Sequence, residues 1–128
     1  MLTQRSDPDR SLIRLLCEGE VTTADLAGHR RAAVLAARDI GRPFVVVTEL
    51  TDCVTISSTA AAVIAETVSQ LVPFGLVGEL RLVSDGTPKS VLAAFDDHQS
   101  AFDVDVVTLS SQEAVDAELD ARLNRTRC

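Results

Sequence analysis

The sequence predicts a single α/β domain with a four- or five-stranded, mostly parallel but mixed sheet and four helices. Four apolar segments rich in β-branched residues are each followed by a segment with apolar residues at helical spacing. The connections between these strands are long enough for right-handed crossovers, which place neighbouring strands in parallel. The chain has 128 residues, of which 46% are hydrophobic, and this suits one domain with a substantial core.

The first two strands are expected at residues 2–5 and 12–20, joined by an Asp-Pro-Asp turn. Thr22 or Thr23 is then expected to cap the first helix. Gly41-Arg42-Pro43 ends this helix, because glycine favours the C-terminal cap and proline cannot continue a helix.

Residues 44–50 are predicted to form the central strand, since this run is almost entirely apolar and β-branched. A loop is expected to follow and to deliver two serines to a strongly apolar helix that starts near Ser58. Pro73-Phe74-Gly75 ends that helix, and the next strand is expected at residues 79–84.

Thr87 is expected to cap the third helix, with Pro88 at its first position. The last strand is predicted at residues 104–109. The run Ser110-Ser111-Gln112-Glu113 predicts a capping box at the start of the last helix. Residues 124–128 are expected to form a polar tail, so the domain covers residues 1–123.

Charge and composition restrict the classes of partner. The formal net charge of -7 opposes binding to nucleic acids and anionic membranes, and four phenylalanines are the only aromatic residues. No apolar run approaches the roughly 20 residues of a membrane span, and the first ten residues lack the apolar run of a signal peptide. We therefore expect a soluble cytoplasmic protein with no nucleic-acid partner and no membrane span.

Motifs of catalysis and cofactor binding are absent from the sequence, including GxGxxG, the P-loop, GxSxG and HExxH. The three cysteines have neither the spacing of a zinc site nor that of a disulfide framework. Cys17 is expected in the core, Cys53 in an exposed loop, and Cys128 at a mobile chain end. His29 and His98 are expected at the surface or the edge of the core. We expect no metal, no cofactor and no enzymatic activity.

Two adjacent serines, Ser57 and Ser58, have a structural and a functional interpretation. One of them caps the second helix, because a serine oxygen can accept from an unpaired N–H of the first turn. Alternatively, one of them is phosphorylated, since a phosphate is well accommodated at a helix N-terminus.

Residues 12–123 resemble the STAS domain, the fold of anti-sigma-factor antagonists, and the related SpoIIAA-like family. Residues 15–22 are similar to that family's strand and turn before the first helix, and residues 44–62 to its central strand and Asp-Ser-Ser-Gly helix start. The Thr-Pro helix start within residues 80–95 and the final strand and helix within residues 104–119 are also similar.

The resemblance assigns roles to particular residues. Glu49 takes the place of the family's strand-end aspartate, and Ser58 that of the serine phosphorylated in its antagonist members. Ser57 stands where the family has aspartate, and Ala60 where it has glycine.

The resemblance implies a non-enzymatic regulatory or protein-interaction module of a bacterial cytoplasm, switched by serine phosphorylation. Its partner would be of the anti-sigma-factor or serine-kinase type. Ser58 and Ser57 are the candidate phosphoacceptors. The candidate interaction loop comprises Glu49, Asp52, Cys53, Thr55 and Thr59.

Other functions stay open at this point. The aliphatic core and the apolar segment at residues 73–77 also suit a carrier or sensor of a small apolar, lipid-like ligand. The same segment, or an exposed edge strand, favours a homodimer. An enzyme would have to use Cys53, Ser57 or Ser58 as its nucleophile, and none has a histidine close in sequence.

Overall fold

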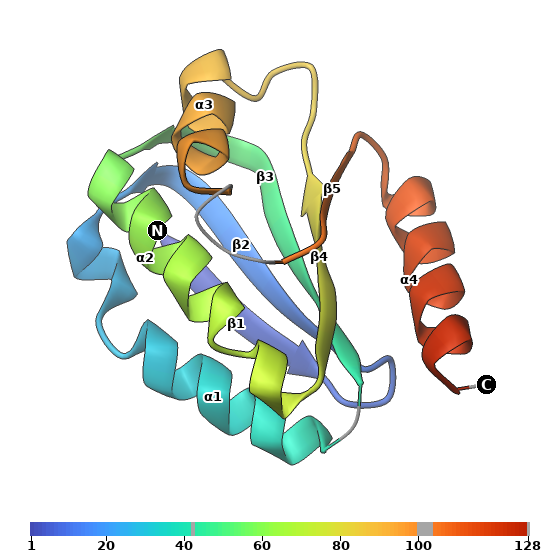
Figure 1. The fold of residues 1–128 in the computed structure, drawn as a ribbon. Helices are drawn as coiled ribbons and strands as arrows, with labels where there is room; N and C mark the ends of the chain where they lie inside the picture. Colours follow the sequence, from blue (N-terminus) through green and yellow to red (C-terminus); the bar gives the residue numbers. More distant parts are fainter. Residues whose placement is uncertain (42, 100–103, 128) are drawn as a thin grey trace.

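The described part of the chain, residues 1–41, 43–99 and 104–127 of a computed structural model, forms a five-stranded sheet with helices on both faces (Figure 1). The elements in chain order are β1 (Leu2–Asp7), β2 (Leu12–Val21), the short 3-10 helix η1 (Thr23–Leu26), α1 (His29–Ile40), β3 (Phe44–Ile56), α2 (Ser58–Ser69), the 3-10 helix η2 (Val72–Phe74), β4 (Leu76–Leu82), α3 (Lys89–Gln99), β5 (Val106–Leu109) and α4 (Gln112–Arg127).

The strands lie in the sheet in the order in which they occur in the chain. Strand β1 is antiparallel to β2, whereas β2, β3, β4 and β5 run parallel to one another. The predicted α/β domain with a mixed, mostly parallel sheet is confirmed. Within the described residues, no helix combines the length and the hydropathy needed to cross a membrane.

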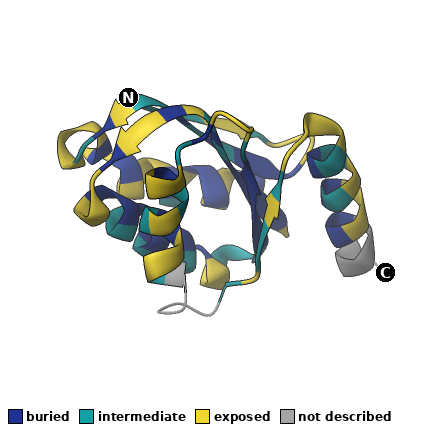
Figure 2. Ribbon diagram, turned by 90° about the horizontal axis from the view of Figure 1, so that it is seen from above, coloured by how far each residue is buried: buried dark blue, intermediate teal, exposed yellow. Residues whose placement is uncertain are grey.

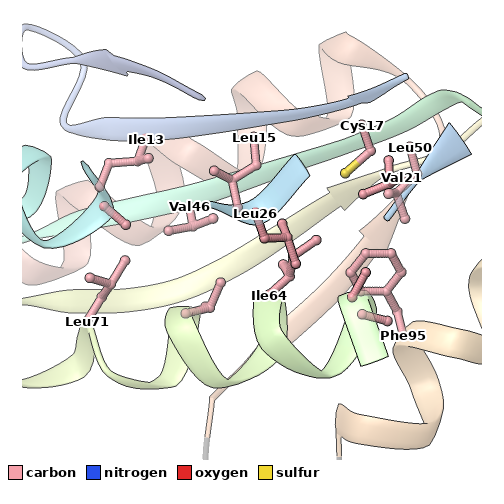
Figure 3. Packing of buried hydrophobic residues seen from close by; sticks show 14 of the residues in the cluster. Ile13, Leu15, Cys17, Val21, Leu26, Val46, Leu50, Ile64, Leu71 and Phe95 are labelled. Atoms are coloured by element: carbon pink, nitrogen blue, oxygen red, sulfur yellow. The ribbon is translucent and has the colours of Figure 1, made fainter. Parts of the chain in front are cut away.

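Both faces of the sheet are covered, and this explains the continuous apolar run in β3. Phe44 and Val46 belong to the larger core beneath α1, α2 and α3, while Val45 and Val47 face α4. Figure 3 shows the larger core, in which aliphatic side chains of the sheet meet Ile64 of α2 and Phe95 of α3. In Figure 2, α4 stands alone on the opposite side of the sheet.

Strand β3 is longer than predicted, so the expected loop after residue 50 is wrong. Residues 52–56 continue the strand and pair with β2, with Asp52 opposite Glu18 and Ile56 opposite Val21. Two register shifts each place an extra residue in β3 relative to β2. These bulges bury residues 50, 53 and 56 at a spacing of three, which conceals the period-two pattern of a strand.

The first predicted helix is divided into two. Asp25 accepts a hydrogen bond from the N–H of Thr22 at 2.9 Å, which begins the short helix η1. Gly28 then adopts a left-handed conformation with φ of 77°, and α1 starts only at His29. Gly41, also left-handed, ends α1 as predicted.

At the starts of α3 and α4, the hydrogen bonds differ from those that the sequence predicted. Thr87 accepts from the N–H of Ser84 at 2.9 Å and donates to the carbonyl of Leu50 at 3.1 Å, so its hydroxyl connects the loop after β4 to the middle of β3. Ser111 caps α4 by accepting from the N–H of Ala114 at 3.1 Å. The predicted capping box is therefore wrong, since the third residue of the helix is alanine.

Some boundaries also differ from the prediction. Strand β4 begins at Leu76, three residues earlier than expected, and β5 begins at Val106 rather than at residue 104. Helix α4 continues through residues 124–127, which were expected to form a tail.

Candidate functional site

The two serines lie at the junction of β3 and α2 and have different environments. Ser57 has extended backbone angles, and its Oγ accepts from the N–H of Ala60 at 3.1 Å. It is therefore the N-cap of α2, as one interpretation of the pair predicted. Ser58 is the first residue of the helix, and its side chain is exposed.

Ser58 has a histidine neighbour that the sequence did not indicate. Its Oγ lies 3.3 Å from Nε2 of His98, near the end of α3. Helices α2 and α3 pack together on the same face of the sheet, and this brings the two side chains together. His98 is half-buried, in agreement with its expected position at the core edge.

The candidate interaction loop divides into exposed and buried positions. Asp52 and Thr55 are exposed on the last part of β3, and Thr59 is exposed on the first turn of α2. Val54 is 64% exposed, an unusual position for a large apolar side chain in a strand. The exposed residues of this segment are called here the β3-end surface: Asp52, Val54, Thr55, Ser58 and Thr59.

Cys53 and Glu49 do not belong to this surface. Cys53 is only 2% exposed, so the expectation of an exposed thiol is wrong. Its Sγ contacts the carbonyl of Thr55 at 3.8 Å, and burial raises the pKa of the thiol. Glu49 forms an ion pair with Arg14 of β2, and it continues the alternation of Val45 and Val47 on the face that α4 covers.

The other cysteines add no reactive thiol to the described part of the chain. Cys17 is 1% exposed in the larger core, as predicted, and burial raises its pKa to about 12. Cys128 lies outside the described residues. Among the residues that the structure describes, no three His, Cys, Asp or Glu side chains form a group that could hold a metal ion.

The surroundings of the β3-end surface are acidic. Glu18 and Glu20 on β2 pair in register with Asp52 and Thr55 on β3. The N-terminal ammonium group adds one positive charge beside β2, where it donates to the carbonyls of Glu18 and Glu20 at 2.7 and 2.6 Å. A partner of this surface would meet a small apolar centre beside carboxylates.

Comparison with known proteins places the fold. No protein-family model matches the chain, and no curated protein matches it in sequence. Among solved structures, the anti-sigma factor antagonist SpoIIAA in its unphosphorylated form matches with a TM-score of 0.60 at 12% identity, over 92% of this chain and 97% of that chain. This chain has a SpoIIAA-like fold.

A second structure supports the same assignment. The Bacillus cell fate determinant SpoIIAA in the phosphorylated form matches with a TM-score of 0.59 at 10% identity, over 92% of this chain and 99% of that chain. The predicted resemblance is thus confirmed for the SpoIIAA-like fold over almost the whole length of both chains. At such low identity the likeness establishes the fold alone.

Proposed function

We propose that this chain is a non-enzymatic regulatory module in which Ser58 is phosphorylated and the β3-end surface binds a partner protein. The observation that carries the proposal is that the two adjacent serines have different environments. Ser57 is engaged as the helix cap, whereas Ser58 presents an exposed hydroxyl one residue further on. The SpoIIAA structures with the same fold include a phosphorylated and an unphosphorylated form.

The position of Ser58 suits a phosphate group. The first turn of α2 provides backbone N–H groups that have no partner within the helix, and the helix dipole favours negative charge there. His98 lies within hydrogen-bonding reach of the Ser58 hydroxyl and can donate to a phosphate oxygen. Phosphorylation is therefore accommodated without unfolding the helix.

The acidic surroundings of Ser58 indicate how its phosphorylation would change the binding of a partner. A phosphoserine would add a charge of about −1.5 to −2 to the β3-end surface, which already carries the carboxylate of Asp52. A partner that tolerates the unmodified surface, and contacts the exposed Val54, would meet much stronger negative charge after modification. We therefore propose that phosphorylation of Ser58 weakens binding of a partner with an acidic or neutral contact surface.

The test is incubation of the protein with the host's serine kinases and ATP, followed by mass spectrometry of the intact chain and its peptides. Ser57→Ala and Ser58→Ala form a matched pair. We expect phosphate on the wild type and on Ser57→Ala, and none on Ser58→Ala. Absence of phosphate from Ser58, together with no partner recovered by pull-down on the unmodified protein, would contradict the proposal.

A further inference from the structure

A second exposed surface that combines apolar and charged side chains lies on α1 and the neighbouring helix η2. Leu35 of α1 is 49% exposed and Val72 of η2 is 46% exposed, so both present large apolar side chains to solvent. The two helices pack together, and the guanidinium group of Arg38 lies 5.6 Å from the centre of the Phe74 ring. The exposed residues Arg31, Leu35, Arg38 and Val72 are called here the α1–η2 surface.

The charge of this surface is opposite to that of the whole chain. Helix α1 carries three arginines and one aspartate, whereas the formal net charge of the chain is -7. Arg31 and Arg38 lie four residues before and three residues after Leu35, so the three side chains share one face of the helix. Of the three arginines, only Arg30 forms an ion pair within the described residues, with Glu66. The α1–η2 surface therefore favours an acidic surface with an apolar centre.

The β3-end surface and its surroundings have this composition. Val54 is 64% exposed, and Asp52 precedes it by two positions on the same strand. Glu18 lies opposite Asp52 in the register of β2 with β3, and Glu20 lies two residues further along β2. One large apolar side chain thus lies among three carboxylates, which complements the arrangement of an apolar side chain between two arginines on α1.

The two surfaces lie at different ends of the molecule, so one copy cannot bring its own two surfaces together. The N–H of Phe44, at the start of β3, donates to the carbonyl of Gly75 at 3.1 Å, which places η2 beside the beginning of the strand. Val54 lies ten residues further along β3, a distance of about 30 Å. Figure 1 shows the end of α1 and the end of β3 on opposite sides of the sheet's length. We propose that the α1–η2 surface binds the β3-end surface of a second copy of this chain.

The geometry of this contact determines the kind of assembly. Because the two contacting surfaces differ, the association is head-to-tail, and a dimer keeps one free surface of each kind to which further copies can bind. The interface contains few large apolar side chains, so we expect weak association, with a Kd between about 10 µM and about 1 mM. The contact does not depend on phosphorylation of Ser58, so it goes beyond the proposed function.

The test is sedimentation velocity of the full-length protein over a range of concentrations. Leu35→Asp alters only the α1–η2 surface and Val54→Asp only the β3-end surface, and both replace exposed side chains. We expect the average mass of the wild type to rise with concentration and each variant alone to remain monomeric. An equal mixture of the two variants should form a dimer and nothing larger, because each variant supplies the surface that the other has lost.

Charge reversal tests the role of the arginines. Arg31→Glu should weaken the association of the wild type at least tenfold, since it places a carboxylate opposite the acidic surface. Lys89→Glu is the matched control, because it reverses another exposed positive charge, at the start of α3, and it should associate within twofold of the wild type. Circular dichroism should show the same helix content in all variants.

Three results would overturn the proposal. The first is a wild type that stays monomeric at about 1 mM, which would leave the α1–η2 surface to a different protein. The second is an equal mixture of Leu35→Asp and Val54→Asp in which no dimer forms, which would exclude a head-to-tail contact. The third is equal association of Arg31→Glu and Lys89→Glu, which would exclude a contribution of the α1 arginines.

Discussion

The hydroxyl of Ser58 and Nε2 of His98 lie 3.3 Å apart, although 40 positions separate the two residues in the chain. The contact joins the first turn of α2 to the last turn of α3, two helices that share one face of the sheet. A change of charge at Ser58 would therefore act directly on the imidazole of His98, on another helix.

A phosphate on Ser58 should make the protein's stability depend on His98. In the unmodified protein, His98→Ala loses one exposed hydrogen bond to a hydroxyl, and we expect a change within about 0.5 kcal/mol. In the phosphorylated protein it removes a charge-assisted donor, and the loss should be larger, about 1 kcal/mol after screening by solvent. Thermal unfolding of both proteins in both states measures the difference. Equal effects of His98→Ala in the two states would exclude a contact between His98 and the phosphate.

The two serines should contribute differently to stability. Ser57→Ala removes the hydrogen bond to the N–H of Ala60, and loss of an N-cap costs about 1 kcal/mol of unfolding free energy. Ser58→Ala changes an exposed first-turn position and should stay within about 0.5 kcal/mol. Urea denaturation of the pair decides the matter. A larger loss for Ser58→Ala would mean that the cap has been assigned to the wrong serine.

Gly78 is expected to be intolerant of any side chain. A Cβ atom there would overlap the guanidinium group of Arg122 and lie 3.2 Å from the carbonyl oxygen of Asp105. Arg122 is held by hydrogen bonds to the carboxylates of Asp105 and Glu118 at 2.8 and 3.1 Å, so it cannot move without breaking them. Gly78→Ala should therefore destabilise the protein by about 1–3 kcal/mol.

Gly86→Ala is the matched control for this substitution. The nearest atom to a Cβ at Gly86 is Oγ of Ser84 at 3.7 Å, an ordinary van der Waals distance. Chemical denaturation should show Gly86→Ala within about 0.5 kcal/mol of the wild type. If the two alanine variants are equally stable, Arg122 does not constrain Gly78.

The sequence was sufficient for the fold because the strands and helices have the composition that their burial demands. The run at residues 44–47 is apolar throughout because helices cover both faces of β3. Such a run can be identified as a buried strand without knowing which strands pair with it. The extension of β3 was missed because the bulges displace its buried residues, Leu50, Cys53 and Ile56, from the period of two.

The site was only partly predictable, for a different reason. The cap and the exposed hydroxyl depend on adjacent residues, and the sequence indicated both. The pairing of Ser58 with His98 depends on how two helices pack, and no spacing in the chain encodes it. The burial of His29 did leave a signal, because it precedes Ala33, Ala37 and Ile40 on one helix face, and all are buried.

Both buried cysteines should be slow to react in the native protein. Cys17 and Cys53 are 1% and 2% exposed, and burial raises the pKa of each thiol, so the reactive thiolate is scarce at neutral pH. Labelling with a mild thiol reagent, followed by peptide mass spectrometry, should show at least tenfold slower modification of both than in urea. Rapid native labelling of Cys53 would show that the end of β3 opens readily.

Protonation of His29 should destabilise the folded protein. Burial lowers its pKa below the ordinary 6.5, so below about pH 6.5 the unfolded chain binds a proton that the folded chain does not. The free energy of unfolding should therefore fall as the pH decreases from 6.5 towards the lower folded-state pKa, by at most about 1.4 kcal/mol per pH unit from this group. Asp25 and Asp116 have pKa values below 3.8, so their contributions are lost at lower pH.

Urea denaturation of the wild type and of His29→Gln between pH 7.5 and pH 5 isolates this contribution. Glutamine retains hydrogen-bonding groups at position 29 but does not titrate, so the stability of the variant should change less over this range. Arg30 beside His29 also disfavours the protonated ring, so raising the salt concentration should reduce the pH dependence slightly while the desolvation effect persists. An unchanged pH dependence in His29→Gln would show that His29 is protonated equally well in the folded and unfolded chains.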